Sequence, residues 1–172
     1  MKHIVLVLAH EDYRDEEYER TLSELIASGV VVKVASTDLT EAKGVKGGTT
    51  PIDLLLSDIN PDDYDGIAFI GGPGSKEYVG DVAVSDLARK FASSGKPIGA
   101  ICYAPAILAK AGLLKGKRAT GWKTEDNNEV PELIVKKGGI YSGESVVTDG
   151  NIITAFNHLS AEEFGKTIAQ ML

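Results

Sequence analysis

A single cysteine, Cys102, lies between an apolar segment at residues 98–101 and a helix-like segment that starts near Ala104. A sharp strand–turn–helix bend exposes one side chain above the edge of a sheet, and small neighbours such as Ala100 leave room for it. The partial positive charge at a helix N-terminus stabilises a thiolate. The pattern therefore predicts a nucleophilic cysteine. A buried, inert cysteine that packs as a small hydrophobe is the alternative.

A nucleophile of this kind needs an oxyanion site. Gly71 and Gly72 follow the apolar segment 66–70, and glycine lets backbone N–H groups approach a ligand closely. We expect the N–H groups of Gly72 and Tyr103 to be the two donors, since Tyr103 directly follows the nucleophile. The alternative for residues 71–74 is an ordinary turn. The segment lacks the GxGxxG pattern, so it predicts no nucleotide site.

The nucleophile also needs an acid or a base. The acidic run at residues 11–19 follows the first strand and opens on the same sheet edge as Cys102. Most of its carboxylates fit a solvated helix start. One carboxylic acid, kept neutral by burial and by a like-charged neighbour such as Glu16, could donate a hydrogen bond to the thiolate.

His158, which follows the last strand, is the candidate general base, and a surface histidine near a helix cap is the alternative. We place His3 in the first strand and His10 in the loop after it. Neither has the spacing of a metal site, and one cysteine makes a zinc cluster improbable. We therefore predict no metal and no cofactor.

Strand-like and helix-like segments alternate along the chain, which predicts a mostly parallel sheet with helices on both faces. In such sheets, ligands bind beyond the carboxyl ends of the strands. We expect a capping box of Ser160 and Glu163 on the last helix, and a hairpin with a type I′ turn at Asp149-Gly150. The expected strands are 4–8, 30–35, 66–70, 98–101, 118–122, 145–148 and 151–155. The expected helices are 15–28, 52–59, 81–93, 104–111, 131–137 and the segment after 160, and residues 41–50 are expected to form a loop or hairpin.

The totals set further limits. The 172 residues fit one domain, 1–172, and the net charge of -7 argues against nucleic acid or an anionic membrane as a partner. No run approaches the roughly 20 apolar residues of a membrane span, and the first apolar stretch, 4–9, is too short for a signal peptide. One cysteine cannot form an internal disulfide, so we expect a cytoplasmic location.

Several motifs together resemble the ThiJ/PfpI family, which includes the parkinsonism-associated deglycase and belongs to the class I glutamine-amidotransferase-like superfamily. The resemblance covers nearly the whole chain. It rests on the elbow Ala100–Pro105, the segment Ala111–Thr120, Tyr13-x-Asp15-x-Glu17, Gly71-Gly72 and Val147-x-Asp149-Gly150-Asn151.

The resemblance implies a flavodoxin-like three-layer sandwich and a homodimer or larger assembly. It also implies a reactive Cys102 with a low pKa and Glu17 as its protonated partner. The chain departs from the family at three places. At the entry to the last helix it reads Phe156-Asn157-His158, where many relatives have arginine followed by Gly-Pro or a similar pair. Tyr103 stands where peptidase-type members have histidine, and Gly121-Trp122 stand where glyoxalase-type and sensor-type relatives often have one. We therefore expect His158 to supply the missing imidazole.

The leading hypothesis is a cofactor-independent cysteine enzyme, of the glyoxalase or deglycase type, that acts on small reactive carbonyls. A cysteine hydrolase of the intracellular peptidase type, with a peptide or amide substrate, would use the same groups. The non-catalytic alternative is a stress-response redox sensor or chaperone that uses oxidation of Cys102. An amidotransferase domain fits less well, since Ser160 stands where its triad has an acid. Besides the catalytic residues, the predicted pocket contains Gly71, Glu16, Trp122 and Asn157.

Overall fold

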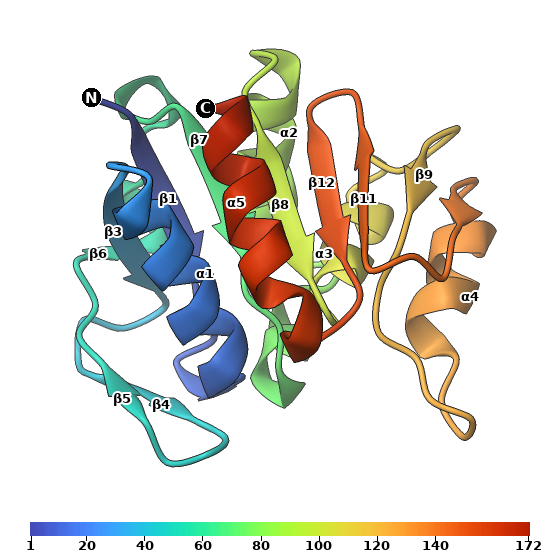
Figure 1. Ribbon diagram of the computed structural model, residues 1–172, viewed down its shortest axis with the longest axis horizontal. Coiled ribbons are helices and arrows are strands. Elements are labelled where there is room, and N and C mark those ends of the chain that lie inside the picture. The colour runs from blue at the N-terminus through green and yellow to red at the C-terminus, as the bar shows by residue number, and fades with distance from the viewer.

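The computed structural model describes residues 1–172 and has one central sheet. Its strands are β1 (His3–Val7), β3 (Val31–Ser36), β6 (Leu54–Leu55), β7 (Gly66–Phe69), β8 (Ile98–Ile101), β11 (Val146–Asp149) and β12 (Ile152–Ala155). Their spatial order is β11-β12-β8-β7-β1-β3-β6 (Figure 1). Every neighbouring pair is parallel except β11 and β12, so the predicted mostly parallel sheet is confirmed.

Helices cover both faces of this sheet. One layer contains α1 (Asp15–Ala27) and α5 (Ala161–Met171), and the other contains α2 (Val82–Ser93) and α3 (Pro105–Lys110) (Figure 1). The shorter α4 (Glu129–Lys136) lies beyond the β11 edge, against α3. The four 3-10 helices are η1 (Leu56–Asp58), η2 (Pro61–Asp63), η3 (Pro73–Tyr78) and η4 (His158–Ser160). The three layers are those of the predicted flavodoxin-like sandwich.

Two smaller sheets flank the central one. The first contains β2 (Glu11–Tyr13), β4 (Ala42–Gly44) and β5 (Thr49–Thr50), and the second pairs β9 (Arg118–Ala119) with β10 (Ile140–Tyr141). The buried carboxylate of Asp15 accepts hydrogen bonds from the N–H groups of Lys46 and Gly48, at 2.7 and 2.8 Å. The first turn of α1 thereby holds the turn of the β4–β5 hairpin.

Side chains of β1 alternate between two apolar cores, one on each face of the sheet. Val5 and Val7 belong to the core under α2 and α3, whereas Ile4 and Leu6 belong to the core under α1 and α5. All four are at most 1 % exposed. A strand covered on both faces needs apolar residues at every position, which explains the unbroken apolar run in the sequence.

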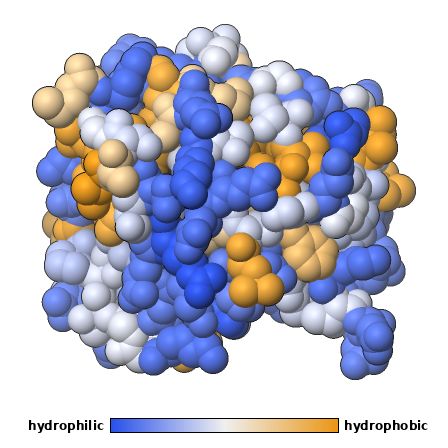
Figure 2. All heavy atoms as spheres, in the orientation of Figure 1, coloured by the Kyte–Doolittle hydropathy of each residue, from blue (hydrophilic) through white to orange (hydrophobic).

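The outer surface over α1 and α5 is largely hydrophilic, with polar side chains down its middle (Figure 2). The two helices approach closely at Gly165, where a Cβ atom would lie 2.8 Å from the Cβ of Glu24 and 3.0 Å from the carbonyl oxygen of Thr21. Only a residue without a side chain fits this contact. The chain contains no helix of the length and apolarity that crossing a membrane requires.

Three local predictions are wrong. Residues 52–59 form β6 and η1 rather than a helix, because Leu54 and Leu55 pair with the edge of β3. The hairpin of β11 and β12 exists, but its central residues are Gly150 and Asn151. Only Gly150 has a positive φ, 61°, which excludes type I′ and matches the first central position of type II′.

The predicted capping box on the last helix is also absent. Ser160 has helical backbone angles and makes no cap hydrogen bond, and its hydroxyl instead accepts one from Ser145 Oγ at 2.8 Å. The Oδ1 atom of Asn157 accepts a hydrogen bond from the Leu159 N–H at 3.0 Å and begins η4. The extra 3-10 turn therefore moves the capping function three residues upstream.

Candidate active site

Cys102 occupies a strained bend directly after β8. Its φ is 63°, one of only two positive values outside glycine. An L-residue in this left-handed region costs roughly 1–2 kcal/mol, so the surrounding structure must hold it there. Two backbone hydrogen bonds do so: its N–H donates to the Ala155 carbonyl at 2.9 Å, and its carbonyl accepts from the Trp122 N–H at 2.8 Å. The bend presents a half-buried sulfur above the carboxyl end of the sheet.

Glu17, in the first turn of α1, lies beside this sulfur and is fully buried. Its Oε2 accepts a hydrogen bond from the Gly71 N–H at 2.9 Å, and its buried Oε1 has no hydrogen-bond partner. A Cβ at Gly71 would lie 2.7 Å from Oε2 and 2.9 Å from the Cβ of Cys102. Gly71 therefore separates the acid from the cysteine with no room for a side chain.

Burial raises the pKa of Glu17 to about 8, although the neighbouring Cys102 side chain, the Gly71 N–H and the charge of Arg14 act in the opposite direction. The carboxyl group is therefore protonated at neutral pH. Its only free oxygen is Oε1, so a proton there can be directed at the sulfur.

The thiol responds to the same neighbours. Burial raises the pKa of Cys102, and an ionised Glu17 raises it further, whereas the Tyr103 N–H and Arg14 lower it. The family resemblance implies a low pKa for Cys102, and an ionised Glu17 would prevent it. It requires Glu17 to keep its proton, because the carboxyl group then donates to the thiolate instead of repelling it.

Gly72 and Tyr103, whose N–H groups are the predicted oxyanion donors, line one pocket together with Cys102. The Tyr103 N–H contacts the Cys102 sulfur, and neither it nor the Gly72 N–H has an oxygen partner within the chain. Gly72 has φ 107°, and a Cβ there would lie 2.5 Å from the backbone nitrogen of Arg14. The arrangement can stabilise an oxygen anion that forms on an atom bonded to the sulfur.

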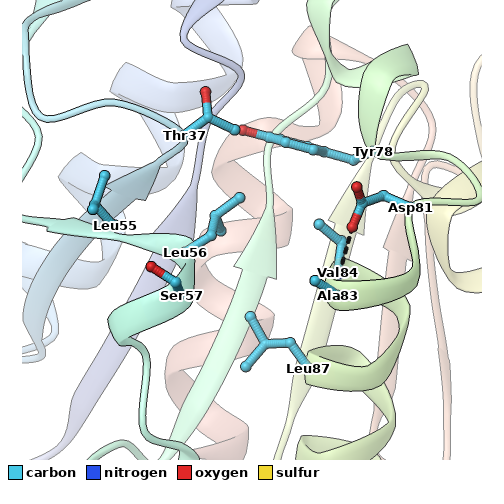
Figure 3. Close-up of a pocket in the computed structure, with 9 residues that line it drawn as sticks. All are labelled: Thr37, Leu55, Leu56, Ser57, Tyr78, Asp81, Ala83, Val84 and Leu87. Carbon is cyan, nitrogen blue, oxygen red and sulfur yellow. Dashed lines mark hydrogen bonds between the residues drawn. The ribbon is translucent and has the colours of Figure 1, made fainter.

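A pocket of about 200 Å³ opens onto Cys102. It is lined by Arg14, Gly72, Pro73, Lys76, Cys102, Tyr103 and Trp122. A second hollow, of about 290 Å³, lies between β6 and η1 on one side and Tyr78 and α2 on the other (Figure 3). Its charged group, Asp81, accepts a hydrogen bond from the Val84 N–H at 2.9 Å as the cap of α2. Its lining contains hydroxyl groups but no cysteine, histidine or lysine that could activate one, so we place the candidate active site at the smaller pocket.

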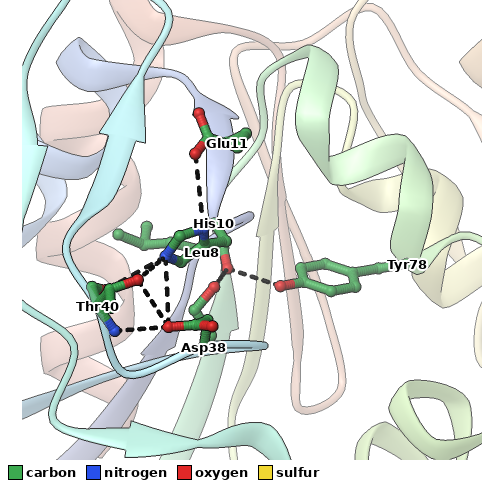
Figure 4. A network of polar contacts seen from close by, with 7 residues as sticks. Leu8, His10, Glu11, Asp38, Thr40 and Tyr78 are labelled. Carbon is green, nitrogen blue, oxygen red and sulfur yellow. Dashed lines mark hydrogen bonds and ion pairs between the residues drawn. The ribbon is translucent and has the colours of Figure 1, made fainter.

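The loop between β1 and α1 carries Arg14 and is fixed by polar contacts (Figure 4). The Leu8 carbonyl accepts hydrogen bonds from the Tyr78 hydroxyl and from Ser36 Oγ, both at 2.8 Å. His10 Nε2 lies 3.0 Å from Thr40 Oγ1, which ties the loop to the end of β3. The segment that leads to the acid is therefore held from both sides.

The structure brings most of the predicted site residues together. Cys102, Glu17 and Gly71 are in contact, and Gly72, Tyr103 and Trp122 line the pocket. The other three predicted residues, Glu16, Asn157 and His158, do not line it.

These three residues have other partners. Glu16 pairs with Arg14, with its Oε2 2.8 Å from the Nε atom, and Asn157 caps η4. The His158 carbonyl accepts a hydrogen bond from Arg20 at 2.9 Å, and the histidine makes no hydrogen bond to Cys102. Burial lowers the pKa of His158, as does the charge of Arg14.

Sequence reasoning missed two cationic side chains of the pocket. Arg14 stands inside the acidic run, where its charge was outweighed by its neighbours, and Lys76 lies in η3, a segment that gave no periodic signal. It also missed Glu129, which accepts a hydrogen bond from the Tyr103 hydroxyl at 2.8 Å. The structure contains no group of three or more side chains placed to hold a metal ion.

Comparison with known proteins identifies the family. The sequence is 37% identical over 170 residues to an uncharacterised protein of Methanocaldococcus jannaschii, covering 98% of this chain and 82% of that one. It is 30% identical to a protein of Pyrococcus abyssi named as a deglycase, covering 88% of each chain. The crystal structure of a ThiJ/PfpI domain protein from Brachyspira murdochii superposes with a TM-score of 0.92 at 28% identity, covering 98% of this chain and 95% of that one. The DJ-1/PfpI family model matches residues 2–171, and the chain therefore belongs to the DJ-1/PfpI family.

Proposed function

We propose that the protein is a cysteine-dependent enzyme that converts small 2-oxoaldehydes to 2-hydroxy acids, with a related activity on aldehyde-modified amines. The observation that carries the proposal is the pairing of Cys102, in a strained bend that opens onto the pocket, with the buried carboxyl group of Glu17. Buried acids with strongly shifted pKa values beside a nucleophile are typical of catalytic sites. The name of the Pyrococcus abyssi deglycase supports the same reaction class.

The first step forms a carbon–sulfur bond. The Cys102 thiolate attacks the aldehyde carbon, and the carbonyl electron pair moves onto oxygen, where the N–H groups of Gly72 and Tyr103 stabilise the charge. Glu17 then gives its proton to this oxygen and becomes a carboxylate. The product is a neutral hemithioacetal, and one proton has moved from Glu17 to the substrate.

The second step moves a proton between adjacent carbons. The Glu17 carboxylate removes the proton from the hemithioacetal carbon, and the neighbouring carbonyl oxygen takes up the proton of the hemithioacetal hydroxyl, which gives an enediolate in its place. Glu17 then returns its proton to the neighbouring carbon while the first oxygen becomes a carbonyl, which leaves a thioester of a 2-hydroxy acid. Water then cleaves the thioester, releasing the acid and the thiol. The net reaction adds one water to the 2-oxoaldehyde, so no oxidant and no cofactor is consumed.

The proposal assigns the proton transfer to Glu17 rather than to His158. Neither residue lines the pocket, but Glu17 lies directly beside the cysteine, whereas His158 makes no hydrogen bond to it. A general base must lie within hydrogen-bond reach of the proton it removes, directly or through one water. Glu17 lies beside the sulfur with Oε1 unpaired, and the proposal requires that this oxygen reach the substrate carbon bonded to the sulfur.

The test is lactate formation from methylglyoxal by the purified protein. We expect lactate from the wild-type protein and a loss of about a thousandfold or more in the Cys102→Ser variant. Lactate no higher than in that variant would overturn the proposal. If peroxide then converts Cys102 to a sulfinate, the redox-sensor alternative is favoured.

A further inference from the structure

The charged residues that line the Cys102 pocket are both cations. Arg14 and Lys76 face this space, and no carboxylate lines it. The chain as a whole carries a net charge of -7, so a pocket with only positive side chains is not what its composition predicts. Glu17 beneath the sulfur is neutral at neutral pH, because burial raises its pKa to about 8.

Arg14 is held in place from two directions. Its backbone N–H donates to the Gly71 carbonyl at 3.0 Å, and its Nε and Nη2 atoms donate to Glu16 at 2.8 and 3.4 Å. The Nη1 atom has no hydrogen-bond partner. A guanidinium fixed on one edge keeps its remaining donors for a ligand, and this geometry suits carboxylate and phosphate oxygens.

Lys76 lines the pocket from η3. Its Nζ is 5.0 Å from the centre of the Tyr103 ring and 3.7 Å from Glu129 Oε2, and about half of its side chain is exposed. Tyr103 also supplies a backbone donor next to the sulfur. The ammonium group is therefore positioned by the residue that contacts the reacting atoms.

We propose that this pocket selects carbonyl compounds that carry an anionic group, a carboxylate or a phosphate, close to the reacting carbon. With that carbon bonded to the sulfur, the anionic group would lie between Arg14 and Lys76. The volume of about 200 Å³ is below the 300–1,000 Å³ of drug-sized sites, which restricts the ligand to a small molecule. The identity of the reacting group rests on the proposed function, whereas the charge preference does not.

The test compares two alkylating reagents of nearly equal size and different charge. Iodoacetate is an anion and iodoacetamide is neutral, and both react with the Cys102 thiolate. Any change in the amount of thiolate affects both rates equally, so the ratio of the iodoacetate to the iodoacetamide rate constant reports the charge preference alone. We expect this ratio to be several times higher than for a free cysteine derivative under the same conditions, and to fall with added salt.

Matched variants assign the preference to the two cations. Lys76→Gln and Arg14→Gln should each lower the ratio about fivefold, and Arg14→Lys should retain most of it. The control is Lys166→Gln on α5, which removes the same charge. Lys166 is 58% exposed and lies 3.9 Å from Glu24, as Lys76 is 54% exposed and 3.7 Å from Glu129. The control should leave the ratio unchanged.

Competition separates the two anion chemistries. Slower alkylation by iodoacetate in inorganic phosphate indicates a phosphate group on the substrate, and slower alkylation in acetate, at equal ionic strength, indicates a carboxylate. A wild-type ratio equal to that of the free thiol would overturn the inference, as would equal ratios in all variants or a cysteine that reacts with neither reagent. If the ratio of the iodoacetate to the iodoacetamide rate constant is high but methylglyoxal is not converted, the proposed reaction is wrong and the anion preference is still supported.

Discussion

Replacing Glu17 with glutamine should remove a large pH dependence from the stability of the fold. In the folded protein the pKa of Glu17 is raised by burial to about 8, from an ordinary value of 4.5. The folded state therefore binds this proton more tightly than the unfolded chain does. The stability that the group contributes is fully present below pH 4.5 and is lost as the pH rises through 8.

The magnitude follows from the width of that window. Between the two pKa values, folding takes up one proton at Glu17, and the free energy of unfolding falls by about 1.4 kcal/mol per pH unit. From pH 5 to pH 8 the loss from this single group is on the order of 3–5 kcal/mol. Glutamine has the same shape, and its Oε1 can still accept the hydrogen bond from the Gly71 N–H, but it cannot ionise.

The assay is urea denaturation of the wild type and of Glu17→Gln at pH 5, 6, 7 and 8. The difference in unfolding free energy should grow with pH in favour of the variant, while the same substitution abolishes lactate formation. Glu19→Gln is the matched control, because Glu19 is exposed on the same helix and the substitution removes the same charge. A constant difference between wild type and variant across this range would refute a buried, protonated Glu17.

Three further substitutions test the geometry of the site. Gly71→Ala should lower the free energy of unfolding by roughly 1–3 kcal/mol and the activity at least tenfold. The added Cβ would lie 2.6 Å from the Ile101 carbonyl oxygen and 2.9 Å from the Cβ of Cys102. Thermal unfolding and lactate assays measure the two effects. The free energy of unfolding of Cys102→Gly, measured by urea denaturation, should exceed that of Cys102→Ala by roughly 1 kcal/mol, because glycine tolerates φ 63°. Equal free energies would contradict backbone strain at this position. His158→Ala should lower turnover less than tenfold, whereas a loss of about 100-fold or more would restore His158 as the general base.

The architecture could be predicted because its signals are local. The apolar run at Ile4–Leu8, the alternation of segments and the strand-to-helix bend at Cys102 each follow from neighbouring residues. The edge pairing of Leu54 with β3 and the hydrogen bond between Ser145 and Ser160 depend on residues far apart in the sequence. For such positions a propensity or a cap motif gives the wrong answer, because tertiary contacts outweigh it.

The candidate site was predictable to a smaller degree. Physical reasoning placed a carboxylic acid near Cys102 but could not choose among the acids of residues 11–19, and the family motif selected Glu17. Glu16 pairs with Arg14 and does not line the predicted pocket, and no sequence pattern shows which member of this pair lines it. The homodimer and the cytoplasmic location that were expected from the sequence stay predictions.

The pH dependence of Cys102 alkylation by neutral iodoacetamide reports whether Glu17 activates the thiol. Burial raises the pKa of Cys102, whereas a hydrogen bond from protonated Glu17, the Tyr103 N–H and the charge of Arg14 favour the thiolate. We expect these three groups to outweigh burial, so the midpoint should lie below the ordinary thiol value of about 8.5. Glu17→Leu, which keeps the site buried but removes the donor, should raise the midpoint by at least about one unit. A wild-type midpoint at or above the ordinary value, unchanged in the leucine variant, would contradict the account.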